Sequence, residues 1–336
     1  SRIFYITTNG YVRDGVLDEK LRLAHEVLNS ESPASRLCPL IYKLDEAQEA
    51  DKPELWEKAN PSLPHMPLLN LKIEQEDLDR RHDKSVELDF YTKRMNLPRT
   101  NLEMAVTDWE NIAASNRPLP DLTGWSCTVG IDYASLRDWA SVNLHFRGGK
   151  DRFDISRSWL CLQSPELSRI KAPWKTWVEN GLVTAVDDVE IAPELLADYI
   201  AAQAARYNIV KLALDNYRFA LLRNALQKVG FSMECKNLYL VRPSDIYKVQ
   251  PVIESCFNNQ YFAWGDCPPL RWAANNTMLV RAGRKEGTDT GNLYYAKIEG
   301  KSRKTDPFMA LVASMVIEDE LGDGGALGTP DVDVFV

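Results

Sequence analysis

Apolar and polar residues alternate along two neighbouring stretches in the middle of the chain. The stretch Trp125–Asp132 alternates, then becomes apolar, and ends on a carboxylate; Trp139–Phe146 alternates again after a short polar turn. A period of two residues predicts β-strands, here an antiparallel pair with Asp132 at the mouth of the hairpin. An acid at that place is commonly a turn former or a helix cap, so its role depends on the rest of the chain.

The pattern continues as one more alternating strand and then as alternating helices and strands. Phe153–Leu162 predicts a third strand, and Ile209–Asp215 is a nearly continuous apolar run that predicts a strand buried on both faces and parallel to its neighbour. Leu238–Val241 predicts another buried strand. Helices are expected at about 166–180, 193–206, 219–228, 245–257, 269–282 and 306–320, with a strand at 293–298.

This order is the one expected for an α/β fold with a ribonuclease-H-like mixed sheet, in which an antiparallel meander is followed by parallel strands and flanked by helices. If the first and fourth strands lie side by side and parallel, their carboxyl ends meet, which brings Asp132 close to Asp215. Asp306 opens the last helix, where Pro307 suits the first turn and an acid favours the positive helix end. Each acid alone could be a turn former or a helix cap.

Three carboxylates from distant segments suit a hard cation. Mg²⁺ and Mn²⁺ prefer several oxygen ligands and keep bound waters. Two such ions about 4 Å apart can activate a water and stabilise the leaving oxygen of a phosphodiester. The joint placement of the acids therefore predicts metal-dependent phosphodiester hydrolysis.

The front of the chain has a different character. It opens directly on an apolar strand, which predicts a fragment of a longer protein, and residues 30–70 are rich in proline and acid, which predicts a lid or linker. Residues 71–93 predict one charged amphipathic helix. We therefore expect domains at 1–117 and 118–321, and a flexible acidic tail at 322–336.

Charge changes the picture where it is unevenly distributed. The net charge of the whole chain is −8, but residues 271–304 hold eight basic and three acidic side chains. This excess predicts a rim that grips DNA phosphates beside the metals, although a solvated loop has the same composition. The expected contacts are Lys297, Lys301, Arg303 and Lys304, with Arg218 and Arg242 as weaker candidates. His145, on the second expected strand, is more commonly a packed histidine than a ligand.

The sequence gives little support for a zinc site, a membrane span or an ATP-binding loop. The six cysteines form no CxxC pair and lack a histidine spaced to complete a zinc site. No window has the roughly 18 consecutive apolar residues of a membrane span, so we expect no membrane partner. Glu299-Gly-Lys-Ser302 imitates the end of a phosphate-binding loop, but Tyr295 stands where its first glycine is required. We expect no ATP site and no ATP hydrolysis in this chain.

Several motifs resemble the large terminase subunit of tailed bacteriophages. Gly130-Ile-Asp132 followed by Asp138, then Ala213-Leu-Asp215, and Lys304-Thr-Asp-Pro-Phe-Met-Ala310 resemble its nuclease domain. Tyr5-Ile-Thr-Thr-Asn-Gly10 resembles the coupling motif of its ATPase, and Trp56-Glu-Lys-Ala-Asn-Pro61 and the helix ending at Asn96-Leu97 resemble the segment joining its two domains. The resemblance covers nearly the whole chain and implies that a partial P-loop ATPase and linker segment precedes the nuclease.

The resemblance implies an endonuclease that cleaves concatemeric viral DNA during packaging. Asp132, Asp215 and Asp306 would bind two Mg²⁺ or Mn²⁺ ions, and Asp138 matches a second acid that either touches the metal or anchors the hairpin. Implied partners are double-stranded DNA, the portal protein and the small terminase subunit, with an oligomeric motor only where the full ATPase is present. The implied location is the host cytoplasm rather than the virion.

Two other hypotheses remain open at the level of sequence. Another ribonuclease-H-like nuclease, a junction resolvase or an RNA–DNA hybrid nuclease, would need the same acids. A non-catalytic nucleic-acid-binding or assembly module could keep the fold without the chemistry.

Overall fold

The computed structural model describes residues 4, 6–8, 16–31, 36–97, 105–133, 138–281, 293–298 and 302–322. The chain divides into two compact units, Ser1–Glu103 and Met104–Val336. The boundary expected between 117 and 118 thus falls inside the second unit. The reason is that Val106 and Ile112, the latter on helix α4 (Trp109–Ala114), are buried in one cluster with Phe308 from the far end of the chain.

The regular elements described in the first unit are all helical, and residues 36–44 have no regular secondary structure. Its core contains Trp56, Ile73 and Phe90, and the Trp56 ring donates a hydrogen bond from Nε1 to the carbonyl of Ala50 at 2.9 Å. The single helix expected over 71–93 is divided, and Arg80 lies over the Phe90 ring. Of the motif at 5–10, residues 6–8 are described and have no regular secondary structure, and the other three lie outside the described residues. The elements are α1 (Val16–Leu28), η1 (Ala47–Asp51), η2 (Pro53–Lys58), η3 (Leu63–His65), α2 (Pro67–Arg80), α3 (Lys84–Asp89) and η4 (Phe90–Arg94).

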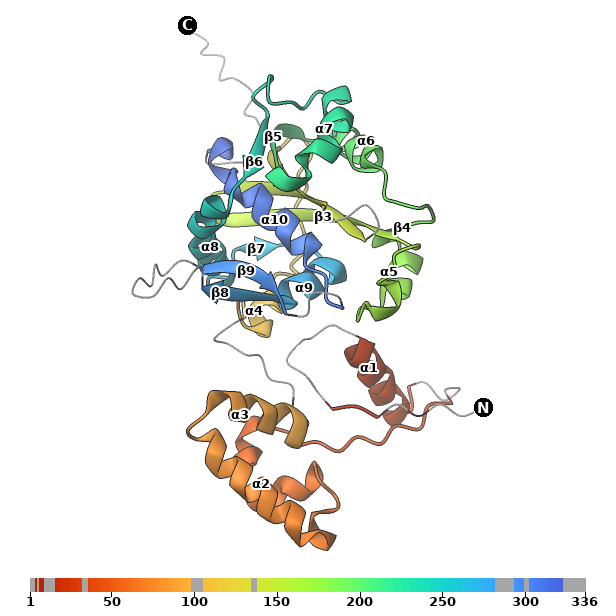
Figure 1. Ribbon diagram of the computed structural model, residues 1–336, viewed down its shortest axis with the longest axis vertical. Coiled ribbons are helices and arrows are strands. Elements are labelled where there is room, and N and C mark those ends of the chain that lie inside the picture. Colours follow the sequence, from red (N-terminus) through yellow and green to blue (C-terminus); the bar gives the residue numbers. More distant parts are fainter. Residues whose placement is uncertain are drawn as a thin grey trace, which may run out of the picture. The chain divides into compact units, whose positions relative to one another are not determined.

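A mixed sheet forms the centre of the second unit (Figure 1). Its order is β4-β3-β2-β1-β5-β6, and β7 pairs with the same edge of β3 as β4 does. The β1–β2 and β2–β3 pairs are antiparallel and the other pairs are parallel. This confirms the predicted fold class. The strands are β1 (Ser126–Tyr133), β2 (Trp139–Gly148), β3 (Asp151–Cys161), β4 (Val183–Val186), β5 (Asn208–Asp215), β6 (Leu238–Val241) and β7 (Phe262–Ala263).

The helices of this unit follow the predicted order with two differences. The helix expected at 269–282 ends at Asn275, and Thr277–Arg281 form a strand because they pair antiparallel with Leu293–Lys297. The single helix expected at 166–180 is divided into a 3-10 helix, η5 (Leu167–Arg169), and an α-helix at residues 174–179 that begins directly after Pro173. The elements are α5 (Trp174–Glu179), α6 (Pro193–Ala204), α7 (Phe219–Lys228), α8 (Pro243–Asn258), α9 (Pro268–Asn275), β8 (Thr277–Arg281), β9 (Leu293–Lys297), α10 (Asp306–Val316) and η7 (Glu318–Leu321). Within the described residues, no helix has the length and apolar character to cross a membrane.

The two faces of the sheet bury different kinds of residue. Val129 and Ile131 of β1 belong to a core cluster with Leu196 of α6 and Leu222 of α7. The alternate residues of β1 point to the opposite face, across which α10 lies (Figure 1). At Gly130 an added Cβ would stand 1.9 Å from the carbonyl oxygen of Ala310. Only glycine at this position lets the helix lie so close to the strand.

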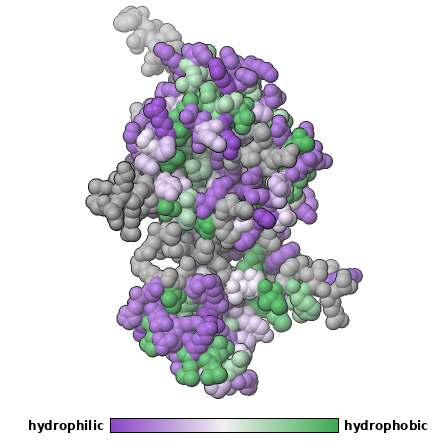
Figure 2. Space-filling view, in the orientation of Figure 1, coloured by the Kyte–Doolittle hydropathy of each residue, from purple (hydrophilic) through white to green (hydrophobic). Residues whose placement is uncertain are grey.

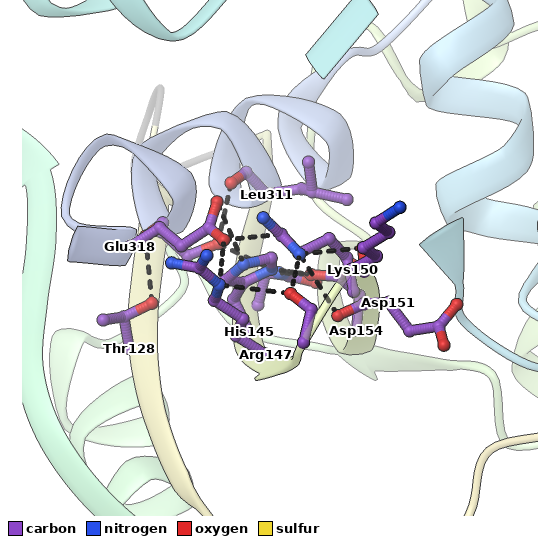
Figure 3. A network of polar contacts seen from close by, with 12 residues as sticks. Thr128, His145, Arg147, Lys150, Asp151, Asp154, Leu311 and Glu318 are labelled. Carbon is purple, nitrogen blue, oxygen red and sulfur yellow. Dashed lines mark hydrogen bonds and ion pairs between the residues drawn. The ribbon is translucent and has the colours of Figure 1, made fainter. Parts of the chain in front are cut away.

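Beneath the carboxyl-terminal half of α10 this face of the sheet carries a buried polar network (Figure 3). His145 of β2 is fully buried, and its Nδ1 lies 2.9 Å from Oδ1 of Asp154 on β3. Arg152 of β3 pairs with Glu318 of η7 at 2.5 Å. Thr128 of β1 donates from Oγ1 to the carbonyl of Ser314 at 2.9 Å. The network fastens the end of α10 to the meander, and His145 is a packed histidine within it.

The surface of the second unit, seen in the same orientation, is largely hydrophilic with small apolar areas between the polar ones (Figure 2). Single apolar side chains are exposed on its helices, among them Leu195 of α6, Leu221 of α7 and Val252 of α8. Scattered exposure of this kind is normal for a folded domain and needs no partner to explain it.

Candidate metal centre

The first two acids stand at the carboxyl ends of adjacent parallel strands. Ile131 of β1 pairs with Leu214 of β5, so Asp132 and Asp215 are the next residues along the two strands. Strand alternation places both on the α10 face, because Gly130 meets α10 and Ala213 packs with Ala313 of that helix. The sheet therefore brings these two acids together, as the sequence predicted.

Asp215 also caps the turn that follows it. Its Oδ1 accepts a hydrogen bond from the backbone N–H of Tyr217 at 2.7 Å, at the start of η6 (Asn216–Arg218). The residue is exposed. The capping role that was an alternative to metal binding is thus real, and it uses the Oδ1 oxygen of the carboxylate.

Asp306, at the start of α10, is fully buried. Its exposed fraction is 0%, and neither carboxylate oxygen has a hydrogen-bond partner within the described part of the chain. A neighbouring cation is the ammonium of Lys297 on β9, with Nζ 3.7 Å from Oδ2. Buried polar groups normally have hydrogen-bond partners, so these two oxygens are placed where they could accept a cation.

The electrostatics show that the other two acids act on Asp132. Burial raises the pKa of Asp132 well above its usual range, and the carboxylates of Asp306 and Asp215 raise it further. Lys297 and Arg218 oppose these effects. Burial would lower the pKa of Lys297, but Asp306, Asp132 and Asp138 together raise it. Like charges held this close favour a divalent cation, which would remove their repulsion.

The donor set fits a hard divalent cation. No three Asp, Glu, His or Cys side chains among the described residues are already arranged as a complete set of ligands. The three acids offer carboxylate oxygens, which are the ligands that Mg²⁺ and Mn²⁺ prefer, and the two oxygens of Asp306 are buried without donors among the described residues. Asp132, Asp215 and Asp306 are the residues that would hold the ion.

Lys304, two residues before Asp306 in the sequence, forms an ionic cluster with Asp138 and Glu166. The ammonium of Lys304 lies 2.6 Å from Oδ2 of Asp138 and 3.2 Å from Oε2 of Glu166. Lys304 is only 1% exposed, so its expected place on the phosphate-gripping rim is wrong. The reason is that it neutralises two carboxylates inside the protein. Burial raises the pKa of Asp138, and the hydrogen bond that Lys304 donates to its Oδ2 opposes this effect. Its other oxygen, Oδ1, is buried without a hydrogen-bond partner in the described part of the chain.

The other expected DNA contacts have different surroundings. Lys297 lies beside Asp306, and Arg218 lies over the ring of Tyr217, close enough to Asp132 to affect its pKa. Arg242 is exposed and directly follows Val241, which pairs with Asp215. Lys301 lies outside the described residues, and Arg303 approaches Asn276 at 3.5 Å. Glu166 was not anticipated, because nothing in its local sequence indicates a partner at Lys304.

The raised pKa of Asp132 predicts a pH dependence of stability in the metal-free protein. Since the folded state holds this proton more tightly than the unfolded state, stability falls as pH rises from the ordinary value of 3.8 towards the raised pKa. Asp132→Asn removes this titration. Melting temperatures in EDTA from about pH 4 to pH 7 should therefore show the wild type losing stability relative to the variant. A difference between the two proteins that does not change with pH would contradict the prediction.

Comparison with known proteins gives concordant results. A model of the family described as terminase large subunit, endonuclease domain, matches residues 38–239, which include Asp132 and Asp215 but not Asp306. Protein YmfN of Escherichia coli (strain K12) is 24% identical over 199 residues, which are 55% of this chain and 44% of YmfN.

One of the similar solved structures shows the same fold over most of the chain. The HK97 bacteriophage large terminase has a TM-score of 0.55 and 17% identity, covering 90% of this chain and 61% of its own. The large terminase nuclease of thermophilic phage G20c with bound magnesium has a TM-score of 0.39 and 10% identity, covering 63% of this chain and 96% of its own. The chain thus spans less than two thirds of YmfN and of the HK97 terminase. Because the family model covers more than half of the chain, this protein belongs to the family of terminase large subunit endonuclease domains.

Proposed function

We propose that the second unit is a divalent-metal-dependent DNA endonuclease that cuts concatemeric viral DNA during phage genome packaging. The observation that carries the proposal is the buried carboxylate of Asp306, which has no hydrogen-bond donor among the described residues and acts electrostatically on Asp132 at the end of β1. Family membership supports DNA as the substrate. The carboxylate-only donor set supports Mg²⁺ or Mn²⁺ as the metal.

Each acid has a distinct task in this proposal. Asp132 and Asp215 present oxygens from the rigid ends of two hydrogen-bonded strands, and Asp306 presents its oxygens from the first turn of α10. Two bound ions would supply an activated water and stabilise the leaving oxygen. Lys297 and Arg218, both close to the acids, would hold the phosphate of the scissile strand. These contacts read phosphate rather than bases, so cleavage would have little sequence preference.

A comparison of substrates tests the proposal. The purified protein is incubated with supercoiled plasmid, a branched DNA junction or an RNA–DNA hybrid, each with Mn²⁺ and with EDTA. We expect cleavage of plasmid DNA with Mn²⁺ and none with EDTA. Preferential cutting of the junction or the hybrid would favour another ribonuclease-H-like nuclease. DNA binding without cutting of any substrate would favour a non-catalytic module.

Family membership also bears on the binding partners of this chain and on the origin of residues 1–117. The family implies double-stranded DNA and the packaging machinery in general, and we propose the portal protein and the small terminase subunit as contacts in the host cytoplasm. We also propose that residues 1–117 derive from the end of an ATPase and its linker. The expectation that this chain hydrolyses no ATP rests on its lack of a complete phosphate-binding loop.

A further inference from the structure

Lys297 lies at the boundary between the buried carboxylate of Asp306 and solvent. Its side chain is 30% exposed, whereas the side chain of Asp306 is 0% exposed. The separation of 3.7 Å between Nζ and Oδ2 is longer than a hydrogen bond. Within the described part of the chain, the ammonium is therefore held near the carboxylate mainly by charge.

The backbone of Lys297, by contrast, is well anchored. Lys297 pairs with Thr277 in the β8–β9 ladder, and Thr277 donates from Oγ1 to the carbonyl of Ala273 on α9 at 2.9 Å. The next residue, Ile298, donates its backbone N–H to the carbonyl of Asn276 at 3.0 Å. A fixed backbone with a four-carbon side chain lets the ammonium change partner while the strand stays in place.

The ammonium of Lys297 and a divalent cation would both be attracted to the carboxylates of the same acids. Lys297 interacts with Asp306, Asp132 and Asp138 together, which includes two of the three proposed metal ligands. A cation bound to those ligands would repel the ammonium at short range. A DNA phosphate at the mouth of the site would attract it, since an ammonium is a compact donor for phosphate oxygens.

We propose that Lys297 is an exchangeable counter-ion that couples metal loading to DNA binding. In the absence of DNA its ammonium neutralises Asp306 and competes with the divalent cation; when DNA arrives, a backbone phosphate takes over the ammonium and leaves Asp306 to the metal. Because such coupling is reciprocal, the metal strengthens DNA binding by the same factor. This inference rests on the proposed function and adds that the site loads fully only with its substrate.

The test measures Mn²⁺ affinity from the electron paramagnetic resonance signal of free Mn²⁺, with and without a short blunt duplex that is checked for integrity afterwards. We expect the duplex to tighten Mn²⁺ binding to the wild type by about 5- to 150-fold, the usual range of coupling between two sites. Lys297→Met should bind Mn²⁺ more tightly than the wild type without DNA, and the duplex should add little. Lys297→Arg keeps the charge and should behave more like the wild type.

Lys228→Met is the matched control. Lys228 is exposed on α7, whose core residues pack on the opposite face of the sheet, so its removal should leave Mn²⁺ affinity unchanged. Unchanged or weaker Mn²⁺ binding by folded Lys297→Met, or a wild type that the duplex does not affect, would overturn the inference. If Asp132→Asn abolishes Mn²⁺ binding in the same series, the proposed metal site survives that result. A wild type that binds no Mn²⁺ overturns both.

Discussion

Replacing Asp306 by asparagine is expected to abolish DNA cleavage and to stabilise the protein at the same time. Cleavage should fall by about a thousandfold or more, because the site loses a charged ligand and with it several kcal/mol of charge stabilisation. The free energy of unfolding without metal should rise, because the neutral amide removes the repulsion between Asp306 and the carboxylate of Asp132. Lys297 then loses one of its three acidic neighbours, and its 30% exposure lets it reach solvent.

Plasmid cleavage with Mn²⁺ and urea unfolding in EDTA measure the two effects. Asp154→Asn is a useful stability control, because Asp154 is also fully buried but accepts hydrogen bonds, among them one from Asn143 at 2.8 Å. That variant should lose stability where Asp306→Asn gains it. Cleavage by Asp306→Asn within tenfold of the wild type would remove Asp306 from the site, and a loss of stability would show that its charge is well satisfied in the folded state.

The sequence could locate the three acids because each stands at a recognisable position in a strand or helix. Asp132 and Asp215 each end an apolar strand, and the order of strands and helices determines that those two strands are neighbours. Asp306 is recognisable because Pro307 follows it at the first turn of an apolar helix. These are local patterns combined with the rules of chain topology, and both can be inferred from the order of residues in the sequence.

Partners that are distant along the chain could not be predicted in this way. The basic stretch before Asp306 indicated a phosphate-binding rim, yet Lys304 points inward to Asp138 and Glu166. Composition cannot distinguish an exposed lysine from a buried one whose charge is neutralised. The same holds for His145 and Asp154, whose pairing depends on the register of β2 against β3.

The prediction of secondary structure was wrong where a short segment fits both the helical and the strand pattern of apolar residues. Residues 269–282 include an apolar stretch that suits a helix, but the Thr277–Arg281 part pairs with β9 instead. A run of five residues is too short for periodicity to decide, and here the partner strand decides. The result matters for function, because the β8–β9 pairing is what presents Lys297 to Asp306.

Gly130→Ala is expected to damage both the fold and the site, because the position of Asp306 depends on how closely α10 lies on β1. The new Cβ would stand 1.9 Å from the carbonyl oxygen of Ala310 and 2.5 Å from the backbone nitrogen of Ser314, so the helix backbone must move. We expect a loss of about 3 kcal/mol in the free energy of unfolding, at the upper end of the usual cost of overpacking.

Cleavage by Gly130→Ala should fall even at temperatures where the variant is folded, because a displaced α10 carries Asp306 away from Asp132. Gly148→Ala is the matched strand control: its Cβ would meet ring atoms of Phe153 and Trp125 at 3.0–3.3 Å, and side chains yield more easily than a helix backbone. Urea unfolding and plasmid cleavage of the two variants measure the difference. If both lose the same stability and both keep cleavage, close contact between α10 and β1 does not position the third acid.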